Sequence, residues 1–173
     1  MPALDTRALS WSRALLKLLL VLNIALAALV AGSILFSIVY EEAVVEHFRG
    51  RAIGGDAAAF VFGFRLFMIL GLFMFPLVHL IAARLLAVVE TVRAGDPFVP
   101  ANAERLTTIA WALLGTQILH LGFGAMAGWL SRENARIDWT FSFTGWLAVL
   151  LLFVLARVFA HGAAMRDELE ATV

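Results

Sequence analysis

The sequence predicts an all-α integral membrane protein, a four-helix bundle in the bilayer with both termini in the cytoplasm. Of its 173 residues, 62% are hydrophobic and 15% are charged, whereas soluble domains average about 45–50% apolar and about 25% charged residues. Four apolar stretches are each long enough to cross a hydrocarbon core of ~30 Å, which needs ~20 helical residues. We expect residues 1–173 to form a single membrane domain, with spans at approximately 14–40, 57–89, 106–130 and 141–164.

The composition also excludes several classes of function. The chain has no cysteine, which removes disulfides, thiolate catalysis and Cys-based metal sites. Its formal net charge is zero, so no basic signal predicts direct contact with nucleic acid. There is no Ser-His-Asp spacing, Gly-rich phosphate loop or metal-ligand pattern, and His47 among the glutamates of residues 41–56 is typical of a solvated loop. We therefore expect no enzyme, catalytic residue, metal or cofactor.

The first span, residues 14–40, is interrupted only by Lys17, Asn23 and small hydroxyl residues. A secretory signal peptide is the alternative, because the Ala-Leu-Ala at residues 25–27 resembles a cleavage site. The apolar region of a signal peptide is only ~7–15 residues long, and this run continues past the candidate site. We therefore interpret it as a transmembrane helix.

The second span, residues 57–89, follows a charged loop at residues 41–56. Pro76 should kink it, because proline removes one backbone hydrogen bond and crowds the preceding turn. The hinge, residues 90–105, is the longest polar break in the chain and separates two pairs of spans. Its Gly-Asp-Pro at residues 95–97 is a turn signal.

The third span, residues 106–130, and the fourth, residues 141–164, are joined by the polar loop at residues 131–140. The acidic tail that follows has carboxylates at Asp167, Glu168 and Glu170. Pairs of small residues let helices approach closely, and two such pairs occur, at Gly124 with Gly128 and at Ala28 with Gly32. They serve either packing within the bundle or a homodimer, and the sequence leaves both open.

The orientation follows from the distribution of Lys and Arg, which are enriched on the cytoplasmic side of membrane proteins. The amino end, the hinge and the carboxyl end share one side in a four-span chain. That side has Arg7, Arg13, Lys17, Arg84, Arg93, Arg105, Arg157 and Arg166. The other side has Arg49, Arg51, Arg132 and Arg136. This bias predicts that the hinge and both termini are cytoplasmic, and in a bacterium it places the chain in the inner membrane.

Arg65 lies inside the second span, about two turns from its outer end, which is ~10 Å at ~1.5 Å per residue. Its natural partners are Glu41 and Glu42, at the outer end of the first span. We expect Arg65 to form a packed ion pair or to extend its guanidinium to the membrane interface. The alternative is that it binds a substrate anion.

Asn23, Gln117 and His120 are the polar residues near the middle of the membrane. Asn23 and Gln117 lie at matching depth, within ~2–3 Å at ~1.5 Å per residue, so an interhelical hydrogen bond between them is the default expectation. No Asp or Glu lies within the core of any predicted span, which argues against a proton pump or a cation-coupled transporter.

Arg157 and His161 are four residues apart, so they share one face of the fourth span. We expect Arg157 to reach the cytoplasmic interface or to pair with an acid such as Glu90 or Glu168. His79 lies at a depth similar to that of His161, and two histidines on facing helices could hold a haem or a metal. No Glu-x-x-His pattern supports such a site, so this histidine pair is only a weak cofactor candidate.

The hinge and the tail resemble those of a bacterial membrane-protein family known as domain of unknown function 2975. The resemblance is carried by the run from Gly95 to Leu106 and by the run from Val158 to Val173. The family pattern falls on Gly95, Pro97, Phe98, Asn102, Glu170 and Thr172, with Asp96 inside the turn. The tail spacing is one residue shorter than in that family. The resemblance implies a membrane-bound partner of a small helix-turn-helix DNA-binding regulator, because members are often encoded beside one.

Two functions remain in view. The first is an interaction or sensory protein that presents the hinge and the acidic tail to a small cytoplasmic regulator. The second is a small transporter or channel subunit, or a binder of a lipophilic ligand such as a lipid, a quinone or haem. In that case Arg65, Gln117 and His120 would line the cavity.

Overall fold

The computed structural model describes residues 3–49, 56–132 and 139–170, and every regular element in them is a helix. The elements are α1 (Ala3–Val39), α2 (Glu41–Arg49), α3 (Ala57–Leu72), α4 (Met74–Arg93), α5 (Pro100–Arg132) and α6 (Phe143–Glu170). Four stretches are long and apolar enough to cross a membrane: Ala8–Val39, Ala57–Arg93, Pro100–Trp129 and Phe143–Arg166. The chain is therefore an all-α, multi-pass membrane protein, as the sequence predicts.

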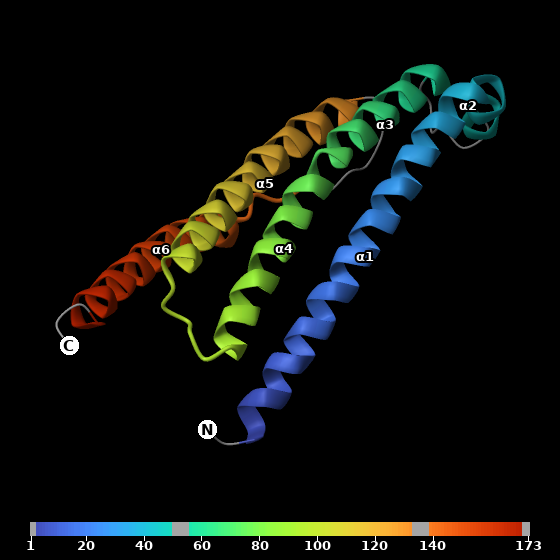
Figure 1. Cartoon of the computed structure of the whole chain (residues 1–173). Coiled ribbons are helices and arrows are strands. Elements are labelled where there is room, and N and C mark those ends of the chain that lie inside the picture. The colour runs from blue at the N-terminus through green and yellow to red at the C-terminus, as the bar shows by residue number, and fades with distance from the viewer. Residues whose placement is uncertain (1–2, 50–55, 133–138, 171–173) are drawn as a thin grey trace.

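The long helices lie side by side in a row. Helix α1 packs against α4 and α3, α4 packs against α5, and α5 packs against α6. In the described parts of the chain no contact joins α1 to α5 or α6, and none joins α4 to α6. Figure 1 shows α1 and α6 at opposite edges of the molecule. The bundle is consequently open, and α5 is covered by protein on more sides than either edge helix.

The best-packed region lies where α4, α5 and α6 meet. Leu106, Ile109 and Ala156 are buried there, with Ile81 and Phe159 packed against them. Buried alanines recur along α5 and α6, because small side chains let helices approach closely in a membrane. Most large apolar side chains elsewhere are exposed, which is the expected state of residues that face lipid tails.

The second predicted span is interrupted, as expected from Pro76. The interruption is at Phe73, between α3 and α4. Pro76 has no N–H to donate to the carbonyl of Leu72, four residues earlier. Near this missing bond, the Phe73 N–H donates to the carbonyl of Leu70, three residues earlier, at 3.3 Å, which is a tighter turn than in an α-helix. The interruption thus lies three residues before Pro76.

The segment predicted as a loop at residues 41–56 begins with a helix, α2. Glu41 and Glu42 lie in its first turn, and His47 and Arg49 lie in its last. Acids near the amino end and bases near the carboxyl end both stabilise a helix through its dipole. That pairing explains why a polar stretch is helical here.

Candidate functional site

The hinge begins with a glycine that ends α4. Gly95 has a φ of +86°, a left-handed conformation that costs an L side chain energy but costs glycine little. The Gly95 N–H donates to the Val92 carbonyl at 3.1 Å, and the Asp96 N–H donates to the Thr91 carbonyl at 3.1 Å. These bonds satisfy the last turn of α4 and direct the chain across to α5.

Asn102 holds the hinge from inside, and its side chain is fully buried, at 0% exposure. Its Nδ2 donates to Thr91 Oγ1 at 2.7 Å and to the Pro97 carbonyl at 2.8 Å. Its Oδ1 accepts from Arg105 Nη1 at 2.8 Å. Thr91 in turn donates to the Val88 carbonyl at 2.7 Å. Because both amide protons and the oxygen are used, Asn102 is a structural clamp and is not available to a ligand.

The hinge also lies against α6. Arg166 forms an ion pair with Asp96, through Nη1 and Oδ1. The rings of Phe98 and Phe159 pack with centroids 5.3 Å apart. A Cβ on Gly162 would lie 3.1 Å from Phe98, so the glycine allows this close approach. The two stretches that carry the family resemblance therefore contact each other and form one surface, the hinge–tail surface.

The acidic tail is a continuation of α6. The apolar span ends at Arg166, and the helix continues to Glu170. Glu168 is exposed, while the side chains of Asp167 and Glu170 lie outside the described residues. Figure 1 shows the first turn of α1, the hinge and the last turn of α6 on the same side of the molecule.

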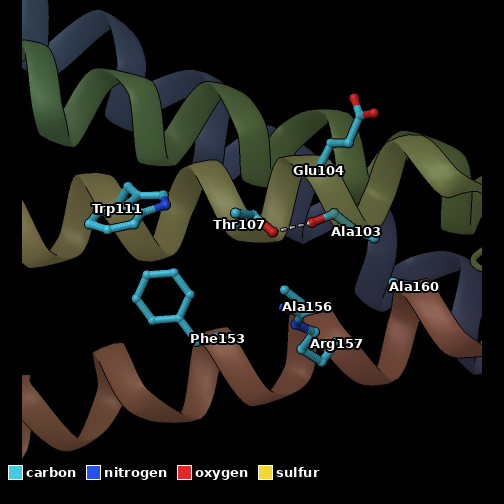
Figure 2. Close-up of a pocket in the computed structure, with 8 residues that line it drawn as sticks. All are labelled: Ala103, Glu104, Thr107, Trp111, Phe153, Ala156, Arg157 and Ala160. Carbon is cyan, nitrogen blue, oxygen red and sulfur yellow. Dashed lines mark hydrogen bonds between the residues drawn. The ribbon is translucent and has the colours of Figure 1, made fainter.

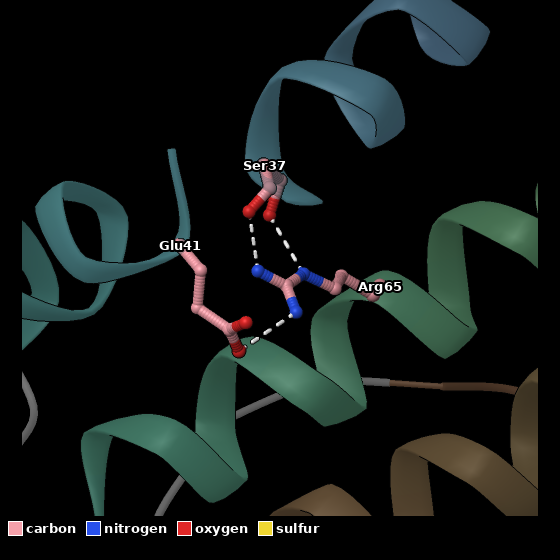
Figure 3. Close-up of polar contacts among 3 residues, drawn as sticks. All are labelled: Ser37, Glu41 and Arg65. Carbon is pink, nitrogen blue, oxygen red and sulfur yellow. Dashed lines mark hydrogen bonds and ion pairs between the residues drawn. The ribbon is translucent and has the colours of Figure 1, made fainter. Parts of the chain in front are cut away.

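Arg65 is occupied by contacts with α1, as Figure 3 shows. Its Nε donates to Ser37 Oγ at 2.8 Å, its Nη1 lies 3.1 Å from Glu41 Oε1, and its Nη2 donates to the Ser37 carbonyl. The predicted pairing with Glu41 is confirmed, while Glu42 is not among its described partners. Ser37 was missed, because a lone serine in an apolar run gives no signal of its own. With its guanidinium occupied in this way, Arg65 is a structural residue.

The predicted hydrogen bond between Asn23 and Gln117 is wrong. Asn23 is on α1 and Gln117 is on α5, and these helices do not touch in the described parts of the chain. Gln117 instead faces α6, where a Cβ on Gly145 would collide with its amide. Matching depth along two helices says nothing about which helices are neighbours.

His120 is covered by an aromatic side chain. Its ring contacts that of Trp139 in a tilted arrangement with centroids 5.5 Å apart, and its carbonyl accepts from Trp139 Nε1 at 3.1 Å. Arg65, Gln117 and His120 therefore contact three different neighbours, namely α1, α6 and the segment before α6. The transporter hypothesis requires them to line a common cavity, and they do not.

His79 and His161, the weak cofactor candidate, do not lie on facing helices. His79 is on α4 and His161 is on α6, with α5 between them and no contact between their helices in the described residues. The same residues contain no group of three His, Cys, Asp or Glu that could hold a metal ion. The side-by-side order of the helices, which spacing along the chain does not reveal, separates the two histidines.

Arg157 does not pair with either acid named for it. Glu90 lies 3.3 Å from Arg13, with which it forms an ion pair. Among the described residues no hydrogen bond or ion pair joins Arg157 to a protein group. Its side chain is exposed, and it lines two adjoining hollows between α5, α6 and the hinge.

These hollows, together the α5–α6 groove, were not anticipated from the sequence. The deeper one lies between α5 and α6 and includes Trp111, Phe153 and Ala160 (Figure 2). The shallower one is lined by Phe98 and His161 and is almost entirely apolar. Arg157 lines both, so the two hollows adjoin at this residue, one toward the hinge and the other toward the middle of the span.

Comparison with known proteins adds one finding. The sequence model of a family described as "Protein of unknown function (DUF2975)" matches residues 54–173. No curated protein and no protein of solved structure matches the chain. The matched residues contain α3 to α6, with the hinge and the tail, whereas α1 lies outside them.

Proposed function

The chain belongs to the DUF2975 family of proteins of unknown function, and on that premise we propose that it is a non-catalytic interaction partner of a small cytoplasmic DNA-binding regulator. The four spans anchor the protein in the bilayer. In this proposal the hinge–tail surface is the part that the regulator binds, in the cytoplasm of a bacterial cell.

The observation that carries the proposal is the contact between the hinge and α6. The Arg166–Asp96 ion pair and the packing of Phe98 on Phe159 join two segments that are about seventy positions apart. They hold the hinge against a helix that continues past the apolar span. The joined surface supports a role in binding.

The charge of the tail favours a basic partner. The tail adds Asp167, Glu168 and Glu170 to the end of α6, and acidic tails often bind other proteins. A DNA-binding regulator has a basic surface, and opposite charges guide association and select partners. A regulator held there would have its DNA-binding surface covered and would be released when the tail is neutralised or moved.

The test is co-purification of the full chain from its host in mild detergent. We expect a small DNA-binding protein to be recovered with the wild type and to be lost from the variant with Asp167, Glu168 and Glu170 replaced by alanine. Alanine at Glu42 and Glu46, two exposed carboxylates of α2, is the control and should leave recovery unchanged. Equal recovery from all three proteins, or recovery of no regulator from the wild type, would contradict the proposal.

The cytoplasmic position of the hinge is tested separately by cysteine labelling, which is simple in a chain without native cysteine. A cysteine at Ala94, which is exposed beside Gly95, should react with a membrane-impermeant maleimide only after the cells are broken. A cysteine at Glu46 should react in intact cells. The reverse pattern would place the hinge–tail surface outside the cell, where no DNA-binding regulator could reach it.

A further inference from the structure

We propose that the α5–α6 groove binds an anionic phospholipid from the leaflet on the hinge side. The phosphate binds between Arg157 and His161, and an acyl chain lies against Trp111 and Phe153. This site adjoins the hinge–tail surface, with which it shares Phe98 and His161, but it does not depend on the regulator proposed above.

Arg157 carries a positive charge inside the fourth span. It lies nine residues before Arg166, the end of the span, which is ~13 Å along the helix at ~1.5 Å per residue. Arginines inside a span are costly, and they normally face the protein interior and pair with another group. Arg157 is exposed and has no partner among the described residues. A counter-ion from the surrounding lipid is therefore consistent with the described residues.

The phosphate of a membrane lipid is the anion available at this position. A guanidinium holds two oxygens of a phosphate at once, and this makes arginine a preferred phosphate ligand. A side chain of this length reaches from below the interface toward the headgroups. His161 is one turn nearer the hinge on the same helix face. It lines the same hollow as Arg157 and offers a ring N–H as a second contact for the phosphate.

The shape of the groove matches the rest of a lipid. At its deeper end the rings of Trp111 and Phe153 meet edge to face, with centroids 5.3 Å apart. Ala156 and Ala160 have small side chains, which leave the space between α5 and α6 open. Arg157 and His161 therefore lie nearer the hinge, and the rings of Trp111 and Phe153 lie farther into the span, which matches the order of phosphate and acyl chain in a leaflet.

One acidic residue of the groove, Glu104, limits the negative charge of the ligand that can bind. Glu104 also lines the groove, and in Figure 2 its carboxylate is directed away from α6 and from Arg157. It does not neutralise Arg157, but it disfavours a second negative charge nearby. Because Arg157 is itself a cation, the ligand that fits is a lipid with a single phosphodiester and no cationic group to compete for the phosphate, of which phosphatidylglycerol is the simplest probe.

Arg84 provides a control matched in depth. It lies nine residues before Arg93, the end of its own span, and its side chain is exposed. It lines neither hollow of the α5–α6 groove. If an arginine at this depth were enough to retain a lipid, Arg84 and Arg157 would contribute equally.

The experiment is native mass spectrometry of the full chain in detergent, with phosphatidylglycerol or phosphatidylcholine of identical acyl chains added. We expect the wild type to retain one phosphatidylglycerol in preference to phosphatidylcholine. Arg157→Gln should lower that retention about tenfold, since a charge-assisted hydrogen bond is lost. Arg84→Gln should leave it unchanged. Ala160→Leu, which keeps the charge but fills the groove, should lower it as well.

Three results would overturn the proposal. The first is an equal loss in Arg157→Gln and Arg84→Gln. The second is equal retention of the two lipids by the wild type. The third is displacement of the bound lipid by millimolar inorganic phosphate, which would identify a soluble anion as the ligand. Unchanged helicity and elution volume in each variant show that a loss comes from the site. Recovery of the regulator should not change in Ala160→Leu, so the two proposals can fail separately.

Discussion

The hinge end of α4, α5 and α6 and the long helix α1 are held in place by different means. At the hinge, directional bonds converge on Asn102, which is fully buried. Helix α1 packs against α4 and α3, but its polar contacts with them described above, Arg13 with Glu90 and Arg65 with Ser37, lie toward its two ends. Between those ends most of its large apolar side chains are exposed.

The difference follows from the solvent. Lipid tails are as apolar as leucine, so burying a leucine between two spans contributes little to their association. Close packing of small residues and polar contacts hold the helices together instead. Where the polar contacts form a network, as at the hinge, the arrangement is rigid. Where they occur only at the ends, as in α1, the helix can rest against lipid along most of its length.

The largest expected effect is the loss of stability when the hydrogen bonds of the hinge are removed. Asn102→Ala removes three hydrogen bonds and leaves the Pro97 carbonyl and the Arg105 guanidinium without that partner, so we expect a loss of about 2–4 kcal/mol of stability. Unfolding in mixed micelles with increasing SDS measures it. Asn23→Ala is the control, since no described hydrogen bond involves that side chain, and it should cost no more than about 0.5 kcal/mol. Equal losses at Asn23 and Asn102 would remove the contrast between the two regions.

The next largest effect is expected when the contacts at one end of α1 are removed. Arg65→Ala removes the contacts with Ser37 and Glu41, and we expect a loss of about 1–3 kcal/mol. The distance between spin labels at Ile38 and Phe62, both exposed, should increase and broaden. Arg49→Ala breaks only an exposed pair with Glu46 and should change neither quantity. An unchanged label distance in Arg65→Ala would mean that packing, and not this arginine, positions α1.

A smaller effect concerns the backbone of the hinge. Gly95→Ala places a side chain at a φ of +86°, which costs about 1–2 kcal/mol. Gly32→Ala in α1 has nothing within 4 Å of the added Cβ and should be neutral or stabilising by up to about 1 kcal/mol, because alanine favours helix. The same unfolding assay gives both values. Opposite signs are expected, and two equal losses would contradict this account of the hinge.

The smallest effect is that of the ion pair between the hinge and the tail. Its side chains are 38% exposed at Asp96 and 45% exposed at Arg166, so a double-mutant cycle to alanine should give about 0.2–1 kcal/mol of coupling. The coupling should decrease as salt is raised from low to physiological concentration. A coupling that does not respond to salt would indicate that the pair is buried by something else, such as a bound partner.

Several contacts followed from the sequence. Arg65 and Glu41 were expected to meet, because both lie near the outer ends of consecutive spans and an arginine at that depth needs an acid. The turn at Gly95 and the interruption near Pro76 were also expected, because the chemistry of glycine and proline acts locally. The hydrogen bond expected between Asn23 and Gln117 is wrong, and the weak candidate site at His79 and His161 does not lie on facing helices, because similar depth does not make two helices neighbours.

Hydropathy and residue chemistry determine how far each residue lies across the membrane, where the chain leaves the bilayer and which turns it makes. They do so because transfer between water and lipid depends on each segment almost independently of the others. The lateral order α1, α4, α5, α6, the burial of Asn102 and the groove beside Arg157 were decided only when the helices packed. Lateral packing depends on which side chains meet across an interface, and no property of a single helix specifies its neighbour.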